Sequence, residues 1–109
     1  MLWLHLLAYV FGGASLANAI PHFVSGMMGQ PFQSPFAKPP GEGLSSSTVN
    51  LLWGFANIVL FYMLVAHVGD FDVRNAAHAA SLGLGILVIG LLAARHFGRF
   101  NGGNTPEHP

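Results

Sequence analysis

The sequence predicts an all-α integral membrane protein, a three-helix bundle that forms a single transmembrane domain over 1-109. Three apolar stretches contain no Asp, Glu or Lys. Each is about 20 residues long, which is the length that a membrane-spanning helix needs. At a rise of about 1.5 Å per residue, each can cross a hydrocarbon core of about 30 Å and satisfy its own backbone hydrogen bonds. We therefore expect helices at about 2-24, 47-68 and 75-98.

The composition excludes an ordinary water-soluble domain. Hydrophobic residues make up 52% of the chain and charged residues only 7%, whereas about 25% of residues are charged in a soluble domain. Four basic and four acidic side chains cancel, so no basic surface for nucleic acid and no polybasic lipid-binding segment is expected. The chain has no cysteine, which excludes a disulfide framework, a thiolate metal site and a cysteine nucleophile.

The connections between the spans differ in kind. The long segment 25-46 is rich in proline and glycine, which oppose helix formation, so we expect a loop. The second connection is short, and the second and third spans should therefore form an antiparallel hairpin in which Asp72 or Asn75 caps the third helix. The tail, 101-109, has nothing apolar to bury and is expected to be disordered.

The end of the first span allows one alternative interpretation. Ala17, Asn18 and Ala19 match the small-x-small pattern that precedes signal-peptide cleavage. No Lys or Arg precedes them, however, and the apolar region is longer than the roughly 7 to 15 residues of a signal peptide. We therefore expect a retained membrane span.

The few basic residues predict an orientation. Three spans place the long loop and the tail on one side, which carries Lys38, Arg95 and Arg99, whereas the other side carries Arg74. Cytoplasmic flanks tend to hold more Lys and Arg. We therefore expect the N-terminus outside and the C-terminus in the cytoplasm.

Small and polar residues recur along the spans at alternating steps of three and four, which is the repeat of a left-handed bundle. Small side chains let helices approach closely in lipid, so Gly12, Gly54, Gly83 and Gly90 are expected to be helix-packing positions. The seam of the first span comprises His5, Ala8, Gly12, Ser15, Ala19 and His22, and that of the third span comprises Ala76, Ala80, Gly83, Leu87, Gly90 and Ala94. Both seams should face protein, either within this chain, in a homo-oligomer or on other membrane subunits.

Polar residues inside the spans predict a structural network. An unpaired amide deep in a span, such as that of Asn57, would be costly in hydrocarbon. If the first two helices are antiparallel, Ser15 and Asn18 lie near the depth of Asn50 and Asn57. We expect these four side chains to form interhelical hydrogen bonds that hold the helices together.

Six histidines suggest a second hypothesis, a metal- or haem-binding redox protein. His5, His67 and His78 fall on the side of the short connection, whereas His22, His96 and His108 fall on the other. Imidazole nitrogen binds transition metals and haem iron, so the first three form a candidate metal site. No pair has the spacing of a metal motif within one helix, and histidines at helix ends also lie at the headgroup level without any ligand.

Neither a nucleophile elbow nor a phosphate-binding loop is present, and the three spans contain no carboxylate. The sequence therefore favours a structural or accessory role through helix contacts. Besides the histidine-based redox protein, a pore or carrier formed on oligomerisation is an alternative, with Asn50 and Asn57 lining it.

Three segments carry a resemblance to a known group. They are Asn-Ala-Ile-Pro-His-Phe-Val-Ser-Gly at 18-26, Pro-Phe-Gln-Ser-Pro-Phe-Ala at 31-37 and Asn-Leu-Leu-Trp-Gly at 50-54. In these segments the chain resembles uncharacterised small bacterial inner-membrane proteins with three transmembrane helices. The resemblance implies a multi-pass protein of the cell inner membrane and brings no activity, cofactor or functional residue with it.

Overall fold

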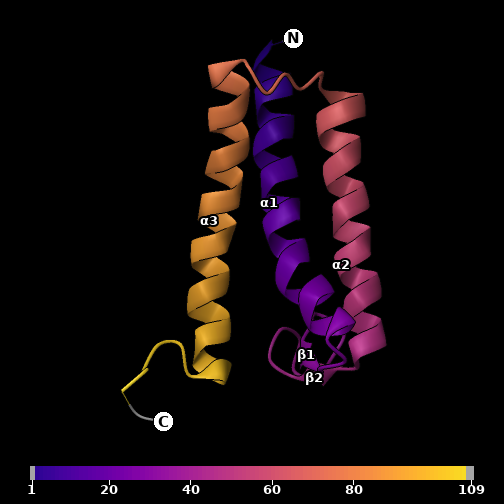
Figure 1. The fold of residues 1–109 in the computed structure, drawn as a ribbon, viewed down its shortest axis with the longest axis vertical. Helices are drawn as coiled ribbons and strands as arrows, with labels where there is room; N and C mark the ends of the chain where they lie inside the picture. Colours follow the sequence, from indigo (N-terminus) through magenta and orange to yellow (C-terminus); the bar gives the residue numbers. More distant parts are fainter. Residues whose placement is uncertain (1, 108–109) are drawn as a thin grey trace.

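The computed structural model describes residues 2–107 and shows a three-helix bundle, which confirms the predicted fold class (Figure 1). Its long helices are α1 (Leu2–Met27), α2 (Ser47–Tyr62) and α3 (Ala76–Asn101). A π-helical segment, η1 (Met63–Val68), continues α2, and two short strands, β1 (Phe32–Gln33) and β2 (Leu44–Ser45), lie in the long connection. α1 runs between α2 and α3, which both pack against it and barely contact each other.

Three helical segments are long and apolar enough to cross a membrane: Leu2–Met27, Ser47–Val68 and Ala76–Asn101. Only the central α1 is buried to any great extent, whereas α2 and α3 expose large apolar side chains along most of their length. Leu52 of α2 and Leu91 of α3, for example, are about three-fifths exposed. Exposure of such an apolar surface to water is unfavourable, whereas its contact with lipid tails is favourable. The helices thus describe a three-span protein whose outer surface contacts the bilayer.

α1 continues past its predicted end at 24 and includes Pro21. Proline has no amide hydrogen, so the carbonyl of Ala17 receives no bond from it. α1 bends towards α2 over its last part (Figure 1), as expected at such a site. The bend carries the end of α1 to the start of α2.

Side chains define the starts of the other helices. The Ser46 hydroxyl accepts a hydrogen bond from the backbone N–H of Val49 at the start of α2. Asn75 Oδ1 accepts from the backbone N–H groups of Ala77 and His78, so Asn75 caps α3. These bonds satisfy donors that a helix leaves free in its first turn.

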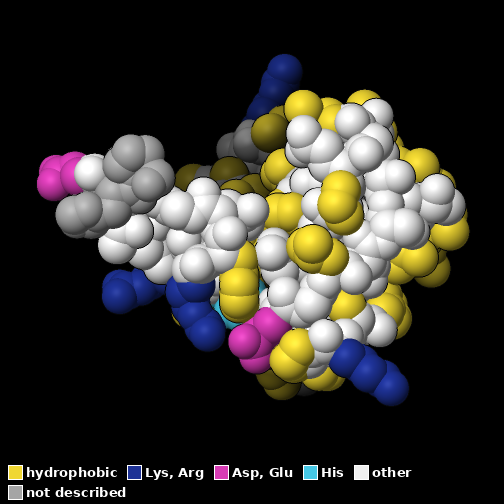
Figure 2. Space-filling model, turned by 90° about the horizontal axis from the view of Figure 1, so that it is seen from below, with side chains coloured by type: hydrophobic (Ala, Val, Ile, Leu, Met, Phe, Trp, Pro, Cys, Tyr) yellow, Lys and Arg dark blue, Asp and Glu magenta, His cyan; other side chains and the backbone are white. Residues whose placement is uncertain are grey.

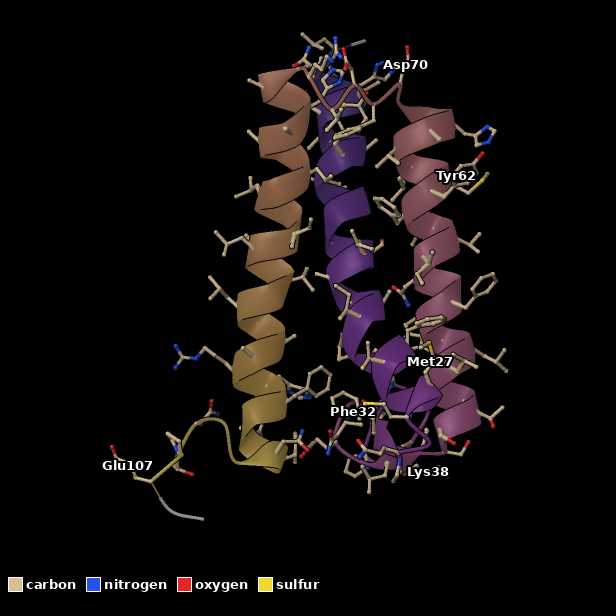
Figure 3. The ribbon with its side chains drawn as sticks, viewed as in Figure 1. Met27, Phe32, Lys38, Tyr62, Asp70 and Glu107 are labelled. Carbon is tan, nitrogen blue, oxygen red and sulfur yellow. The ribbon has the colours of Figure 1, made fainter. Side chains whose placement is uncertain are left out.

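The long connection contains structure that the sequence pattern did not predict. β1 and β2 pair antiparallel, with Phe32 opposite Ser45 and Gln33 opposite Leu44. Between the strands, the backbone N–H groups of Gly41 and Ala37 donate to the carbonyl of Ser34. The segment is therefore a folded cover over one end of the bundle, at which Phe32 and Lys38 lie (Figure 3).

Glycines set the closest helix contacts. A methyl group at Gly85 of α3 would overlap the carbonyl oxygen of Val10 in α1, and one at Gly54 of α2 would lie 2.6 Å from the backbone nitrogen of Phe23. Gly12 faces Val65, whose Cγ1 would lie 2.8 Å from a methyl group there. Gly83 and Gly90 differ, because a methyl group at either would meet no described atom within 4 Å.

Most of the seam expected on α3 is turned away from α1, although Gly90 and Ala94 line a hollow of about 400 Å³ together with Ile20 and Pro21 of α1. All six of its positions are exposed: Ala76, Ala80, Gly83, Leu87, Gly90 and Ala94. α3 instead meets α1 through the opposite side, which carries Leu82, Gly85 and Ile86. We call the six exposed positions the outer seam.

The opposite end of the bundle is closed by an aromatic cluster. Tyr9 is fully buried, and its hydroxyl accepts a hydrogen bond of 2.9 Å from the backbone N–H of Asp70. Phe71 and His78 stack against the Tyr9 ring at centroid distances of 5.2 and 4.6 Å. Tyr9 thereby ties the short connection to α1.

The sequence predicts a disordered tail at 101-109. In the structure, the tail turns at Gly102, which has a φ of 81°. Beyond this turn it lies against the end of α3, where Asn104 Nδ2 donates a hydrogen bond to the carbonyl oxygen of Arg95. A methyl group at Gly98 would lie 2.5 Å from Asn104 Oδ1. The prediction for the last two residues, and His108 with it, falls outside the described residues.

Candidate functional site

A cavity of about 310 Å³ lies under the long connection, between the ends of α1 and α3 and the start of α2. Its polar lining comes from Asn18, His22, Gln33, Ser34, Trp53 and His96, and its apolar lining includes Phe97. None of its lining residues is Lys, Arg, Asp or Glu. We call this space the loop-end cavity.

Charged side chains at this end of the molecule lie outside the cavity. In Figure 2, which views this end, most of the surface is uncharged, and a basic and an acidic side chain lie beside the histidine that is visible there. Arg99 and Glu42 approach to 3.8 Å, and both are about half exposed. An ion pair so exposed to solvent contributes little to stability, so the site beneath has a neutral, partly apolar character.

Asn50 organises the site although it lies outside the cavity lining. Its side chain is completely buried, and its Nδ2 donates to the carbonyl oxygens of Phe32, Ser45 and Ser46 at 3.1 to 3.2 Å. The Oδ1 atom lies 2.7 Å from Nδ1 of His22. One amide therefore joins both strands of the connection to α1.

These bonds determine which nitrogen of His22 carries hydrogen. Because three carbonyl oxygens surround Asn50 Nδ2, the other amide atom must be the oxygen, which only accepts. His22 Nδ1 is then the N–H donor, and its Nε2 carries a lone pair in the neutral ring. Phe32 and Phe97 pack edge-on against this ring at 5.5 and 5.8 Å and hold its plane.

His96 is oriented in a similar way from α3. Its Nε2 lies 2.6 Å from the carbonyl oxygen of Gly41, which can only accept, so Nε2 is the donor. Its Nδ1 therefore carries the lone pair in the neutral ring. Gly41 has a φ of 77°, a left-handed conformation that glycine adopts without strain. This turn brings the carbonyl over the histidine.

Trp53 contributes an unpaired donor. Its Nε1 is the one buried side-chain nitrogen or oxygen that has no hydrogen-bond partner among residues 2–107. Nearby, Asn57 Nδ2 donates to the carbonyl oxygen of Trp53 at 2.9 Å, and Asn57 Oδ1 accepts from Asn18 Nδ2 at 3.2 Å. A buried donor without an acceptor costs about 1–3 kcal/mol. The Trp53 ring lines the cavity and also packs edge-on against Phe36 at a centroid distance of 5.1 Å.

Two apolar hollows adjoin the cavity along α1. The nearer one, of about 210 Å³, shares Asn18, His96 and Phe97 with the cavity and also includes Ile89 and Leu92. The farther one, of about 470 Å³, also has Asn18 and Ile89 in its lining. Its other lining residues are Phe11, Ala14, Ser15, Asn57, Leu60 and Leu64. We call the two hollows together the α2–α3 groove.

The structure does not bring the three candidate metal ligands together. His78 Nδ1 accepts from the backbone N–H of Asp72, and His67 stacks instead on Tyr62 at a centroid distance of 5.4 Å. His5 lies on α1, near the start of the chain. Among residues 2–107, no three His, Cys, Asp or Glu side chains form a group that could hold a metal ion.

The four residues of the expected polar network bond in three separate places. Asn18 and Asn57 bond to each other between α1 and α2. Ser15 bonds within its own helix, to the carbonyl oxygen of Phe11, and Asn50 bonds to His22 and to the long connection. The sequence pattern places His22 and His96 on one side of the membrane but indicates no site for them, for Gln33 or for Trp53. No simple sequence pattern predicts that a proline-rich connection folds over a cavity.

No family model, curated protein or solved structure matches this chain. Its own geometry and chemistry therefore have to carry the functional inference.

Proposed function

We propose that this chain is a multi-pass protein of a bacterial inner membrane with a structural or accessory role, acting through helix contacts with a second copy of itself. The outer seam of α3 carries this proposal. Five of its six residues are small, and all six are exposed among residues 2–107, which suits the close approach of a partner helix in lipid.

The physical argument rests on what drives association in lipid. Lipid tails are as apolar as leucine, so helices associate through close packing and interhelical hydrogen bonds. Gly83 and Gly90 leave the backbone of α3 open, with no described atom within 4 Å of a methyl group at either position. A neighbouring helix can approach there as closely as α1 approaches Gly85 on the other side.

Cysteine cross-linking tests the interface directly, because the natural chain contains no cysteine. We expect Leu87→Cys, on the outer seam, to form a disulfide-linked dimer in oxidised membranes. Leu52→Cys, on the exposed surface of α2, is the matched control and should stay monomeric. Equal cross-linking at both positions would show random collision and contradict the proposed interface.

A second pair of variants tests whether packing at the outer seam holds the dimer together. The double variant Gly83→Ile/Gly90→Ile places branched side chains on the outer seam and should weaken the dimer at least about tenfold, equivalent to about 1.4 kcal/mol. Leu84→Phe/Val88→Phe adds bulk on the exposed surface beside the seam and should leave the dimer intact. Light scattering in a mild detergent measures both, and a monomeric natural chain would refute self-association.

A further inference from the structure

We propose that the loop-end cavity binds the head of a lipid. The head would be uncharged and would carry an oxygen acceptor and a hydroxyl group, and its apolar tail would lie in the α2–α3 groove. This goes beyond helix association, and it uses a different surface from the outer seam.

The charge of the lining defines the class of head. No Lys, Arg, Asp or Glu lines the cavity, so a phosphate or an ammonium group would be buried there without a counter-charge. Burying an unpaired charge is strongly unfavourable. An uncharged head meets no such penalty.

The hydrogen-bonding groups define its chemistry further. Trp53 Nε1–H is buried and lacks an acceptor within residues 2–107, so it calls for an oxygen such as a carbonyl. His22 has its Nδ1–H engaged by Asn50, which leaves Nε2 as an acceptor for a hydroxyl group. Asn18 uses its Nδ2 on Asn57, and its Oδ1 provides a further acceptor. His96, which also lines the cavity, has a third acceptor in its Nδ1. One unpaired donor and three acceptors, in a mostly apolar pocket, fit a ligand with a carbonyl and a hydroxyl.

The α2–α3 groove defines the tail. From His22 to Phe11 along α1 is about 16 Å at about 1.5 Å per residue, which is about half the hydrocarbon thickness of a bilayer. The groove is lined along this distance by apolar side chains such as Leu60, Leu64 and Ile89. A head held at the loop end can therefore extend one chain to the middle of the membrane. The tail can enter the groove from lipid, because α2 and α3 barely contact each other.

Two sources share this chemistry, namely a quinol, whose hydroxyl groups both donate and accept hydrogen bonds, and a diacylglycerol, which has ester carbonyls and a free hydroxyl group. We would measure equilibrium binding of a tritium-labelled benzoquinone with a decyl tail, its reduced quinol, and tritium-labelled dioctanoylglycerol to the full chain in maltoside micelles. The quinol or the diacylglycerol should bind saturably, and the quinone, which lacks a hydroxyl group, should bind more weakly. Phosphatidylglycerol, which is anionic, should compete poorly with the ligand that binds saturably.

The variant Trp53→Phe tests the donor without removing any hydrogen bond that the side chain makes within residues 2–107. We expect about tenfold weaker binding, the effect of one hydrogen bond. Trp3→Phe is the matched control, because Trp3 is more than half exposed, and it should bind as the natural chain does. Equal affinity of the two variants, saturable binding of neither the quinol nor the diacylglycerol, or stronger competition by phosphatidylglycerol would overturn the proposal.

Filling the groove tests the tail separately. Ile89 lines both hollows, so Ile89→Trp should weaken binding of the tailed ligand at least tenfold and leave binding of the same head without its tail unchanged. Leu84→Trp, on the exposed surface of α3, is the control. If Ile89→Trp binds the tailed ligand as the natural chain does, the tail lies elsewhere and the proposed site is wrong.

Discussion

At the scale of single residues, Asn50 has the greatest influence on the loop end. Its one amide bonds to both strands of the connection and to His22, so it determines the position of the cover and the hydrogen on the histidine. A neutral amide can donate to several backbone carbonyls without the energetic cost of burying a charged side chain. Removing it would leave several polar groups unpaired at once.

We therefore expect Asn50→Leu to lower the free energy of unfolding by about 3 kcal/mol or more, since each unpaired buried group costs about 1–3 kcal/mol. Thr48→Leu, on the same turn and exposed, should change it by less than about 0.5 kcal/mol. Unfolding followed by circular dichroism in detergent micelles measures both. Similar stability of the two variants would show that Asn50 does not hold the connection.

At the scale of the helices, α3 carries glycines on two faces, and only one of these faces packs on another helix among residues 2–107. Gly85 is buried against α1, whereas Gly83, two residues earlier, is exposed. Hydropathy cannot tell these faces apart, because lipid and protein interiors are both apolar. Only the packing of α3 on α1 shows which glycine is needed for the fold of one chain.

Adding a single methyl group at each glycine separates the two roles. Gly85→Ala should destabilise the monomer by about 1–3 kcal/mol, the range for overpacking, because the methyl group overlaps the carbonyl oxygen of Val10. Gly83→Ala should be neutral or stabilising by up to about 1 kcal/mol, since alanine favours helix more than glycine does. Unfolding in a detergent that keeps the chain monomeric compares them, and equal effects would contradict the α1–α3 contact.

At the scale of the whole molecule, the charged residues gather at the two ends of an apolar bundle. Asp70 lies at the end with the short connection and Lys38 at the end with the long one (Figure 3). The loop end also carries Arg95 and Arg99. If the positive-inside tendency decides orientation, the cavity lies on the cytoplasmic side.

Single cysteines in the cysteine-free chain test this orientation. A membrane-impermeant thiol reagent applied to intact cells should label Asp72→Cys and leave Glu42→Cys and Thr105→Cys unlabelled until the membrane is opened. Asp72 and Glu42 are both exposed, so access to the reagent and not burial in the protein decides the result. The reverse pattern would place the loop end outside.

Much of the architecture is predictable from the sequence, and the site is predictable only in part. Length and hydropathy indicate the three helices, and Asn75 was one of two expected caps. The bond between Asn18 and Asn57 joins helices at the depth that antiparallel packing implies. The paired strands of the long connection could not be foreseen, because Phe32 and Ser45 are held by a side chain from α2.

By itself, the sequence determined that this chain has three apolar helices suited to a bilayer, a proline-rich connection at one end and few charges anywhere. Tertiary structure alone decided that α1 is central, that the outer seam of α3 is exposed among residues 2–107, and that His22, Trp53 and His96 line one cavity. The reason is physical: helical periodicity states which residues share a face, whereas the neighbour that each face meets depends on packing between distant segments.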